Sequence, residues 1–155
     1  MTTPRTKTLR IESLAIGDEL LDGRVLDSNT RNLGDTLSVL GLELHGARTV
    51  PDDRALIIGA LRDAIARADV VVTSGGLGPT SDDITGECIA EAAGVGLRFD
   101  EPAYLRMRAM FDARGIAMPE SNRRQAMLPS TSRCGAFPAC RVNTSTCAKT
   151  ISCRR

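Results

Sequence analysis

Two adjacent carboxylates, Asp82 and Asp83, end a glycine-rich loop and are the side chains of this sequence best suited to chemistry. The loop follows a short apolar run at residues 69–73 and precedes a helical pattern. A strand, a glycine-rich loop and a helix in that order are typical of phosphate-binding junctions in parallel sheets. Glycines let the backbone approach a ligand closely. The loop therefore predicts phosphate binding, and the residues expected to contribute are Gly75, Gly76, Gly78, Thr80 and Ser81.

The negative charge of this loop predicts that a cation takes part in phosphate binding. The segment 74–83 contains no Lys or Arg, so it is not a Walker-type loop, and its carboxylates would repel a bare phosphate. A divalent ion removes that conflict, because hard cations bind carboxylate and phosphate oxygens together. A second acidic pair, Asp18 and Glu19, follows the first predicted strand, and right-handed crossovers bring such loops to one edge of the sheet. We predict a crevice between the two loops, with Mg²⁺ or a similar ion held by Asp18, Glu19 and Asp82.

Each of these acids also has a purely structural explanation. Asp82 or Asp83 could cap the helix that follows, and we expect one capping role and one catalytic or metal-binding role between them, with either role alone left open. Asp18 and Glu19 could form a solvated turn. Asp52 stands between a predicted strand and a predicted helix, so it could be a helix cap or a residue of the active site. The glycine-rich loop itself could be a tight connection without a ligand.

The elements that would position these residues follow from apolar periodicity. We expect strands at 9–16, 42–50 and 69–73, helices at 28–40, 51–68, 84–93 and 101–114, and a short turn or helix within 119–127. Alternation of strands and helices predicts a three-layer α/β/α domain in which a mainly parallel sheet is covered on both faces. We assign residues 1–8 to a disordered leader and residues 9–132 to this domain.

The chain changes character near residue 132. Residues 1–132 carry 19 acidic and 15 basic side chains, a net charge of −4, whereas residues 133–155 carry five basic and no acidic side chains. Four of the five cysteines also lie in this tail, at spacings that do not match zinc sites. Excess Arg and Cys without acids is typical of a GC-rich gene read out of frame. We therefore expect an incomplete domain at its C-terminus, followed by an unstructured or frameshifted tail.

The amino-acid composition limits the kinds of partner that this chain is expected to bind. Three Phe, one Tyr and no Trp argue against stacking platforms for nucleic acid. No apolar run approaches the roughly 20 residues that span a bilayer, and the N-terminus does not resemble a signal peptide. We expect a cytoplasmic protein whose partner is a small phosphate-bearing molecule, not a nucleic acid or a membrane. The exposed edge of a shortened sheet favours association, which leaves a homo-oligomer open.

Several short segments carry a family resemblance. They are Ile16-Gly-Asp-Glu-Leu-Leu-Asp-Gly23, Asp27-Ser-Asn29, Val50-Pro-Asp-Asp53, the glycine-rich run 73–85 and Asn122-Arg-Arg-Gln-Ala126. Over about residues 9–128 the chain resembles the amino-terminal domain of the competence/damage-inducible CinA family, which is similar to the MoaB/Mog molybdopterin-binding domains. The resemblance implies a pterin or nucleotide phosphate in the crevice, with Asp52 and Asp83 serving the chemistry. Asn29 completes the candidate ligand-binding set.

The resemblance also implies an activity. CinA-type domains are associated with divalent-metal-dependent hydrolysis of ADP-ribose to AMP and ribose 5-phosphate, which makes an ADP-ribose pyrophosphatase the leading hypothesis. A module that holds molybdopterin or a nucleotide without chemistry is an alternative, and an inactive truncated product is another. After about residue 129 the family motifs Asn-Pro-x-Gly-Thr-Ala-Pro-Gly and Pro-Gly-x-Pro are missing. Pterin, ADP-ribose and other nucleotides all stay open as ligands.

Overall fold

A four-stranded sheet forms the centre of the protein in the computed structural model, which describes residues 9–130 and 149–152. Strand β1 (Ile11–Ile16) lies between β2 (Leu44–Val50) and β3 (Val70–Ser74) and runs parallel to both. Strand β6 (Lys149–Ser152) pairs antiparallel with β3 and ends the order β2-β1-β3-β6. The expected mainly parallel sheet is therefore confirmed.

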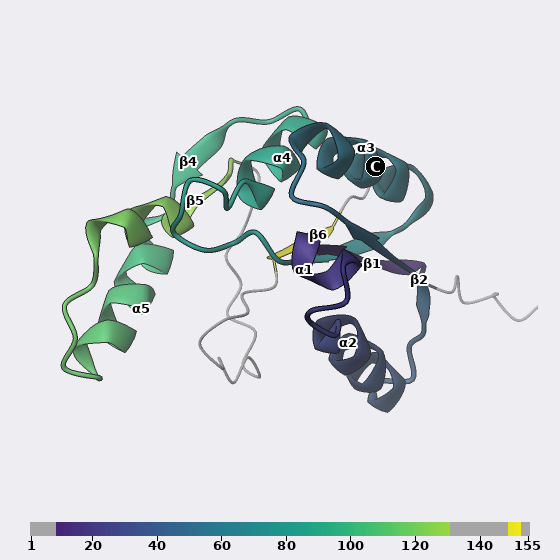
Figure 1. The fold of residues 1–155 in the computed structure, drawn as a ribbon, viewed down its shortest axis with the longest axis horizontal. Coiled ribbons are helices and arrows are strands. Elements are labelled where there is room, and N and C mark those ends of the chain that lie inside the picture. The colour runs from purple at the N-terminus through teal and green to yellow at the C-terminus, as the bar shows by residue number, and fades with distance from the viewer. Residues whose placement is uncertain (1–8, 131–148, 153–155) are drawn as a thin grey trace, which may run out of the picture.

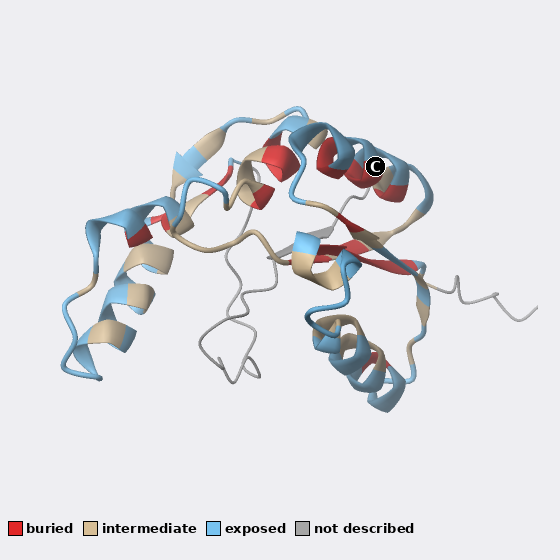
Figure 2. Cartoon of the chain, in the orientation of Figure 1, coloured by how far each residue is buried: buried red, intermediate tan, exposed pale blue. Residues whose placement is uncertain are grey.

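Helices cover both faces of this sheet. Helices α3 (Arg54–Arg67) and α4 (Thr85–Ala92) lie on one face, and α2 (Ser28–Val39) lies on the other (Figure 1). The apolar core fills the layer between the sheet and the first pair, as the red segments of Figure 2 show. Its largest fully buried apolar side chains are Leu14, Ile16, Ile57, Leu61 and Ile89. Strand β1 is buried along its whole length, which explains why its sequence lacks a solvent-facing alternation.

A smaller unit extends from the side of the sheet. Strands β4 (Leu97–Phe99) and β5 (Met127–Pro129) pair antiparallel, and between them the chain forms α5 (Glu101–Asp112) and the 3₁₀ helix η1 (Glu120–Ala126). Every residue of α5 keeps at least partial exposure, and the helix projects away from the central layers (Figures 1 and 2). Among the described residues, no helix is both long and apolar enough to cross a bilayer.

Aspartates cap three of the helices, and at the start of α5 the carboxylate of Asp100 accepts a hydrogen bond from the N–H of Ala103. The carboxylate of Asp27 accepts a hydrogen bond from the N–H of Thr30 at the start of α2, and Asp53 accepts one from Leu56 at the start of α3. These bonds satisfy N–H groups that have no partner within the helix. Helix α4 begins differently: its N-cap is Ile84, and no side chain among the described residues caps it. The expected capping role for Asp82 or Asp83 is therefore wrong.

Other expectations needed smaller corrections. The first acidic loop contains a single helical turn, α1 (Asp18–Leu21), in place of an irregular loop. Apolar periodicity also places Leu40 and Leu56 on the buried faces of their helices, yet these side chains are 66% and 52% exposed. Leu40 lies past the last turn of α2, and α3 turns the neighbouring Ile57 toward the core instead. The leader and most of the tail lie outside the described residues; the described part of the tail is β6.

Candidate ligand-binding site

An acidic depression of about 610 Å³ opens at the carboxyl ends of the parallel strands. Because β1 runs parallel to both neighbours, the loops after all three strands reach the same edge of the sheet. The loops after β1 and β3, which carry the two acidic pairs, do face one crevice. The turn after β2 lines the same crevice through Asp52. The polar side chains that line the depression are Asp18, Glu19, Asp52, Ser81, Asp82 and Asp83.

Asp52 connects the first two of these loops. Its carboxylate accepts a hydrogen bond of 3.2 Å from the backbone N–H of Asp18. Partial burial of the carboxylate raises the pKa of Asp52, and the negative charges of Asp18, Glu19 and Asp83 raise it further, although the bond from Asp18 acts in the opposite direction. A carboxylate with a raised pKa that faces a depression is well suited to accept a proton during a reaction.

Two loop glycines are required by close packing. Gly75 has φ +91°, and a Cβ there would lie 1.8 Å from the carbonyl oxygen of Ile16. Gly76 has φ +57°, and its Cβ would lie 2.3 Å from the hydroxyl oxygen of Thr85. That hydroxyl donates a hydrogen bond of 2.9 Å to the carbonyl of Gly75. The start of the loop is therefore fixed between β1 and α4, which accounts for these glycines without a ligand.

The carboxylate of Asp83 accepts hydrogen bonds from loop groups that we expected to donate to phosphate. Its carboxylate accepts hydrogen bonds from the backbone N–H of Gly78, from the backbone N–H of Thr80 at 2.9 Å and from the Thr80 hydroxyl. Partial burial raises the pKa of Asp83, but these bonds outweigh it, so the net pKa lies below the ordinary value. The loop thus folds around its own carboxylate, which stays ionised and is less suited than Asp52 to act as a base.

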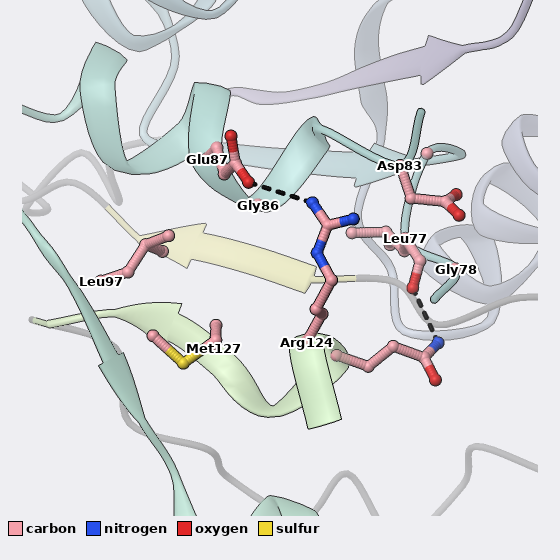
Figure 3. A pocket seen from close by; sticks show the side chains of 10 residues that line it. Leu77, Gly78, Asp83, Gly86, Glu87, Leu97, Arg124 and Met127 are labelled. Atoms are coloured by element: carbon pink, nitrogen blue, oxygen red, sulfur yellow. Dashed lines mark hydrogen bonds and ion pairs between the residues drawn. The ribbon is translucent and has the colours of Figure 1, made fainter. Parts of the chain in front are cut away.

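A second cavity of about 220 Å³ lies on the other side of the loop and is lined in part by η1. From η1, Gln125 Nε2 donates to the carbonyl of Leu77 at 2.8 Å, and Arg124 Nη1 donates to the carbonyl of Thr80 at 2.8 Å. Figure 3 shows Arg124 reaching toward Glu87 of α4, at 3.3 Å. Sequence reasoning missed Arg124 and Gln125 as site residues; their only signal was the segment 122–126 within the family resemblance.

Some predicted site residues lie apart from both cavities. Among the described residues that line either cavity, Asn29, Gly75 and Thr80 are not found. Asn29 stands in the first turn of α2, Gly75 packs against β1, and Thr80 turns toward Asp83. Ser81 lines the acidic depression and its hydroxyl donates to Asp82 at 3.2 Å.

The acidic residues suit a cation that is shared with a ligand. Within the described residues, no three His, Cys, Asp or Glu side chains converge closely enough to form a metal-binding group. The depression nevertheless gathers the carboxylates of five acidic residues, which are Asp18, Glu19, Asp52, Asp82 and Asp83. Mg²⁺ is usually held by one or two carboxylates together with substrate phosphates. The donor set therefore fits such a shared ion and does not provide a cage made by protein alone.

A parallel sheet with a glycine-rich loop and an acidic crevice at its edge defines a three-layer α/β domain of the kind that binds small phosphate-bearing molecules. The chain belongs to the family described as "Probable molybdopterin binding domain", whose model matches residues 12–152. The resemblance found in the sequence is thus confirmed.

Full-length relatives place the chain with the CinA-like proteins. A CinA-like protein of Anaeromyxobacter dehalogenans (strain 2CP-1) is 45% identical over 121 residues, which cover 78% of this chain and 30% of the relative. A CinA-like protein of Frankia casuarinae is 47% identical over 126 residues, which cover 78% of this chain and 29% of the relative. The chain therefore spans about 30% of the length of the curated relatives it matches.

Solved structures agree. The protein CinA from Thermoplasma acidophilum, described as of unknown function, is 33% identical with a TM-score of 0.70, and the match covers 81% of this chain and 73% of that one. MoaB from Pyrococcus furiosus, described as a tungsten cofactor synthesizing protein, is 30% identical with a TM-score of 0.54, covering 70% and 66%. The MoaB-like fold is confirmed.

Proposed function

We propose that the chain binds a phosphate-bearing pterin or nucleotide in the acidic depression and, with a divalent ion, hydrolyses ADP-ribose or a related nucleoside diphosphate sugar. One observation carries the proposal: the loops after β1, β2 and β3 bring Asp18, Asp52 and Asp83 to a single depression beside a glycine-rich loop. Membership of a family of molybdopterin-binding domains supports a ligand of this size and charge.

Asp52 is the base in this proposal. It would accept the proton of a water whose oxygen attacks one phosphorus of the pyrophosphate, while the bond between that phosphorus and the bridging oxygen breaks. Its raised pKa makes Asp52 a stronger base than a carboxylate with an ordinary pKa. Asp18, Glu19 and Asp82 would hold the divalent ion, which when bound neutralises phosphate charge. Asp83 shapes the loop through Gly78 and Thr80.

One feature favours the alternative of a binding module without chemistry. The N–H groups of Gly78 and Thr80 are already bonded to Asp83, so these two are not available to stabilise charge that develops on a phosphoryl group. A pterin or nucleotide held by the remaining polar groups would then be bound and released unchanged. MoaB, named as a cofactor-synthesizing protein, shares the fold and is compatible with either outcome.

A paired assay separates the two. The chain is incubated with Mg²⁺ and ADP-ribose, AMP release is followed, and the thermal midpoint is recorded in the same samples. We expect AMP from the wild type, loss of AMP but retained thermal stabilisation in Asp52→Asn, and no change in Asp35→Asn on the exposed side of α2. Stabilisation without product in the wild type would establish the binding module. Neither stabilisation nor product would rule out both functions.

A further inference from the structure

Two side chains of η1 hold the glycine-rich loop from outside. Gln125 donates to the carbonyl of Leu77 and Arg124 donates to the carbonyl of Thr80, each at 2.8 Å, across 48 and 44 positions of sequence. The two accepting carbonyls flank the tip of the loop, and Figure 3 shows the bond at Leu77 as a dashed line. Both donor residues, Gln125 and Arg124, line the smaller cavity and not the acidic depression.

A carbonyl that is held in place also fixes the next N–H group. The C=O and N–H of a trans peptide unit point in opposite directions, and the described peptide bonds are all trans. With the carbonyl of Leu77 bonded to η1, the N–H of Gly78 points away from η1, and there it donates to Asp83. With the carbonyl of Thr80 bonded to Arg124, the N–H of Ser81 points away from η1 as well, and Ser81 lines the acidic depression.

η1 is itself anchored, which makes it a suitable support. The guanidinium carbon of Arg123 lies 4.4 Å from the centre of the Phe99 ring and 5.9 Å from that of Tyr104. Asn122 is buried, and its Nδ2 donates to Gln125 Oε1 at 2.7 Å. With its oxygen occupied by that bond, the Gln125 amide presents its nitrogen to Leu77.

We infer that Gln125 and Arg124 are positioning residues that set the direction of the loop N–H groups: that of Gly78 toward Asp83, and that of Ser81 toward the acidic depression, where it can donate to the phosphate or pyrophosphate group of a ligand. The inference rests on the proposed function for the identity of the ligand, but its geometric part concerns the free protein. If the loop were held mainly by its own internal bonds, removal of a donor from η1 would leave the Gly78 N–H unchanged.

The decisive variant is Gln125→Glu. A glutamate keeps the length of the side chain and can still accept from Asn122, but an ionised carboxylate cannot donate to the carbonyl of Leu77. Arg124→Gln is the second variant and removes the other support. Glu120→Gln is the control, because it changes an exposed side chain of the same helix and leaves both the anchoring contact of Arg123 and the two bonds to the loop in place.

Two measurements are made on each ¹⁵N-labelled protein: hydrogen exchange of individual amides, and affinity for inorganic pyrophosphate in the presence of Mg²⁺. We expect Gln125→Glu and Arg124→Gln to speed exchange at Gly78 or Thr80, whose N–H groups are bonded to Asp83, and to weaken pyrophosphate binding roughly threefold to tenfold. Amides of β1 and β3 and the thermal midpoint should stay as in the wild type, and the Glu120→Gln control should keep the loop exchange and the affinity.

The results separate failure of this inference from failure of the proposed function. Unchanged loop exchange in both η1 variants would overturn the positioning role, whatever the affinity. Wild-type protein that does not bind pyrophosphate would count against the proposed function, while faster exchange at Gly78 in Gln125→Glu would still support the positioning role. A general loss of protection throughout β1 and β3 would show that η1 supports the whole fold, and that would overturn the inference too.

Discussion

The backbone N–H of Asp18 donates a 3.2 Å hydrogen bond to the carboxylate of Asp52, which ties the turn after β2 to the turn after β1. The bond brings one acidic turn close to another, so the attraction of a single N–H is set against repulsion between carboxylates. Such an arrangement costs stability in the free protein and is favourable once a cation or a proton is present.

Replacing Asp52 by Asn is expected to stabilise the free protein at neutral pH. The folded-state pKa of Asp52 is raised, so its ionised form disfavours the native state, and the penalty grows as pH rises from the ordinary value of 3.8 through the folded pKa. Because Asp52 is largely exposed, the gain is on the order of 0.5 kcal/mol. Thermal unfolding at pH 7 and pH 4 tests this: a midpoint in Asp52→Asn no higher than that of the wild type at pH 7 contradicts it.

Replacing Asp83 by Asn is expected to have the opposite effect. Its folded-state pKa is lowered by bonds from Thr80 and Gly78, so the ionised form stabilises the native state above pH 3.8, and this contribution is lost as pH falls through the folded pKa. Weakening these bonds should cost about 1 kcal/mol at pH 7. Asp82→Asn is the control, since Asp82 accepts one exposed bond from Ser81. Equal urea midpoints for Asp83→Asn and Asp82→Asn would show that the loop bonds contribute nothing.

Substituting alanine for glycine should lower stability where the glycine is closely packed and raise it where a helical glycine faces open space. Gly75→Ala places a methyl group against the carbonyl of Ile16 at a positive φ, and we expect a loss of at least about 3 kcal/mol or failure to fold. Gly59→Ala, in the middle of α3, meets no described atom within 4 Å and should gain about 0.5–1 kcal/mol. Chemical denaturation measures both. A tolerated Gly75→Ala would mean that the loop can leave β1.

The effect of a divalent ion should depend on the ligand. The described residues form no group of three metal-binding side chains, so Mg²⁺ alone is expected to raise the thermal midpoint little. With ADP-ribose present the ion gains phosphate oxygens, and the pair should stabilise the protein more than the sum of the two separately. Scanning fluorimetry with each alone and both together gives the comparison. A large shift with Mg²⁺ alone would point to a resident metal site.

Local sequence patterns predicted the central layers well, because β1 and β3 are short apolar strands and the helices between them carry clear periodicity. The crevice followed from the rule that parallel strands end at one edge. Strands β4 and β5 were missed because each has three residues and they pair across about thirty positions. The same distance problem hid the bond from Gln125 to Leu77. The bonds of Asp83 were missed for another reason: a glycine-rich loop predicts open donors, and only the folded backbone shows that a nearby carboxylate already uses them.

The contact between Gly75 and Ile16 has a consequence for how a ligand could enter. The loop begins on a point where β1 leaves no space for a Cβ, and Thr85 bonds to the carbonyls of both Gly75 and Gly76 from the start of α4. Both ends of the loop are therefore pinned to the sheet and to one helix. Any rearrangement around a bound ligand is confined to the arc from residue 77 to residue 84, where the other supports among the described residues include the bonds from Gln125 to Leu77 and from Arg124 to Thr80.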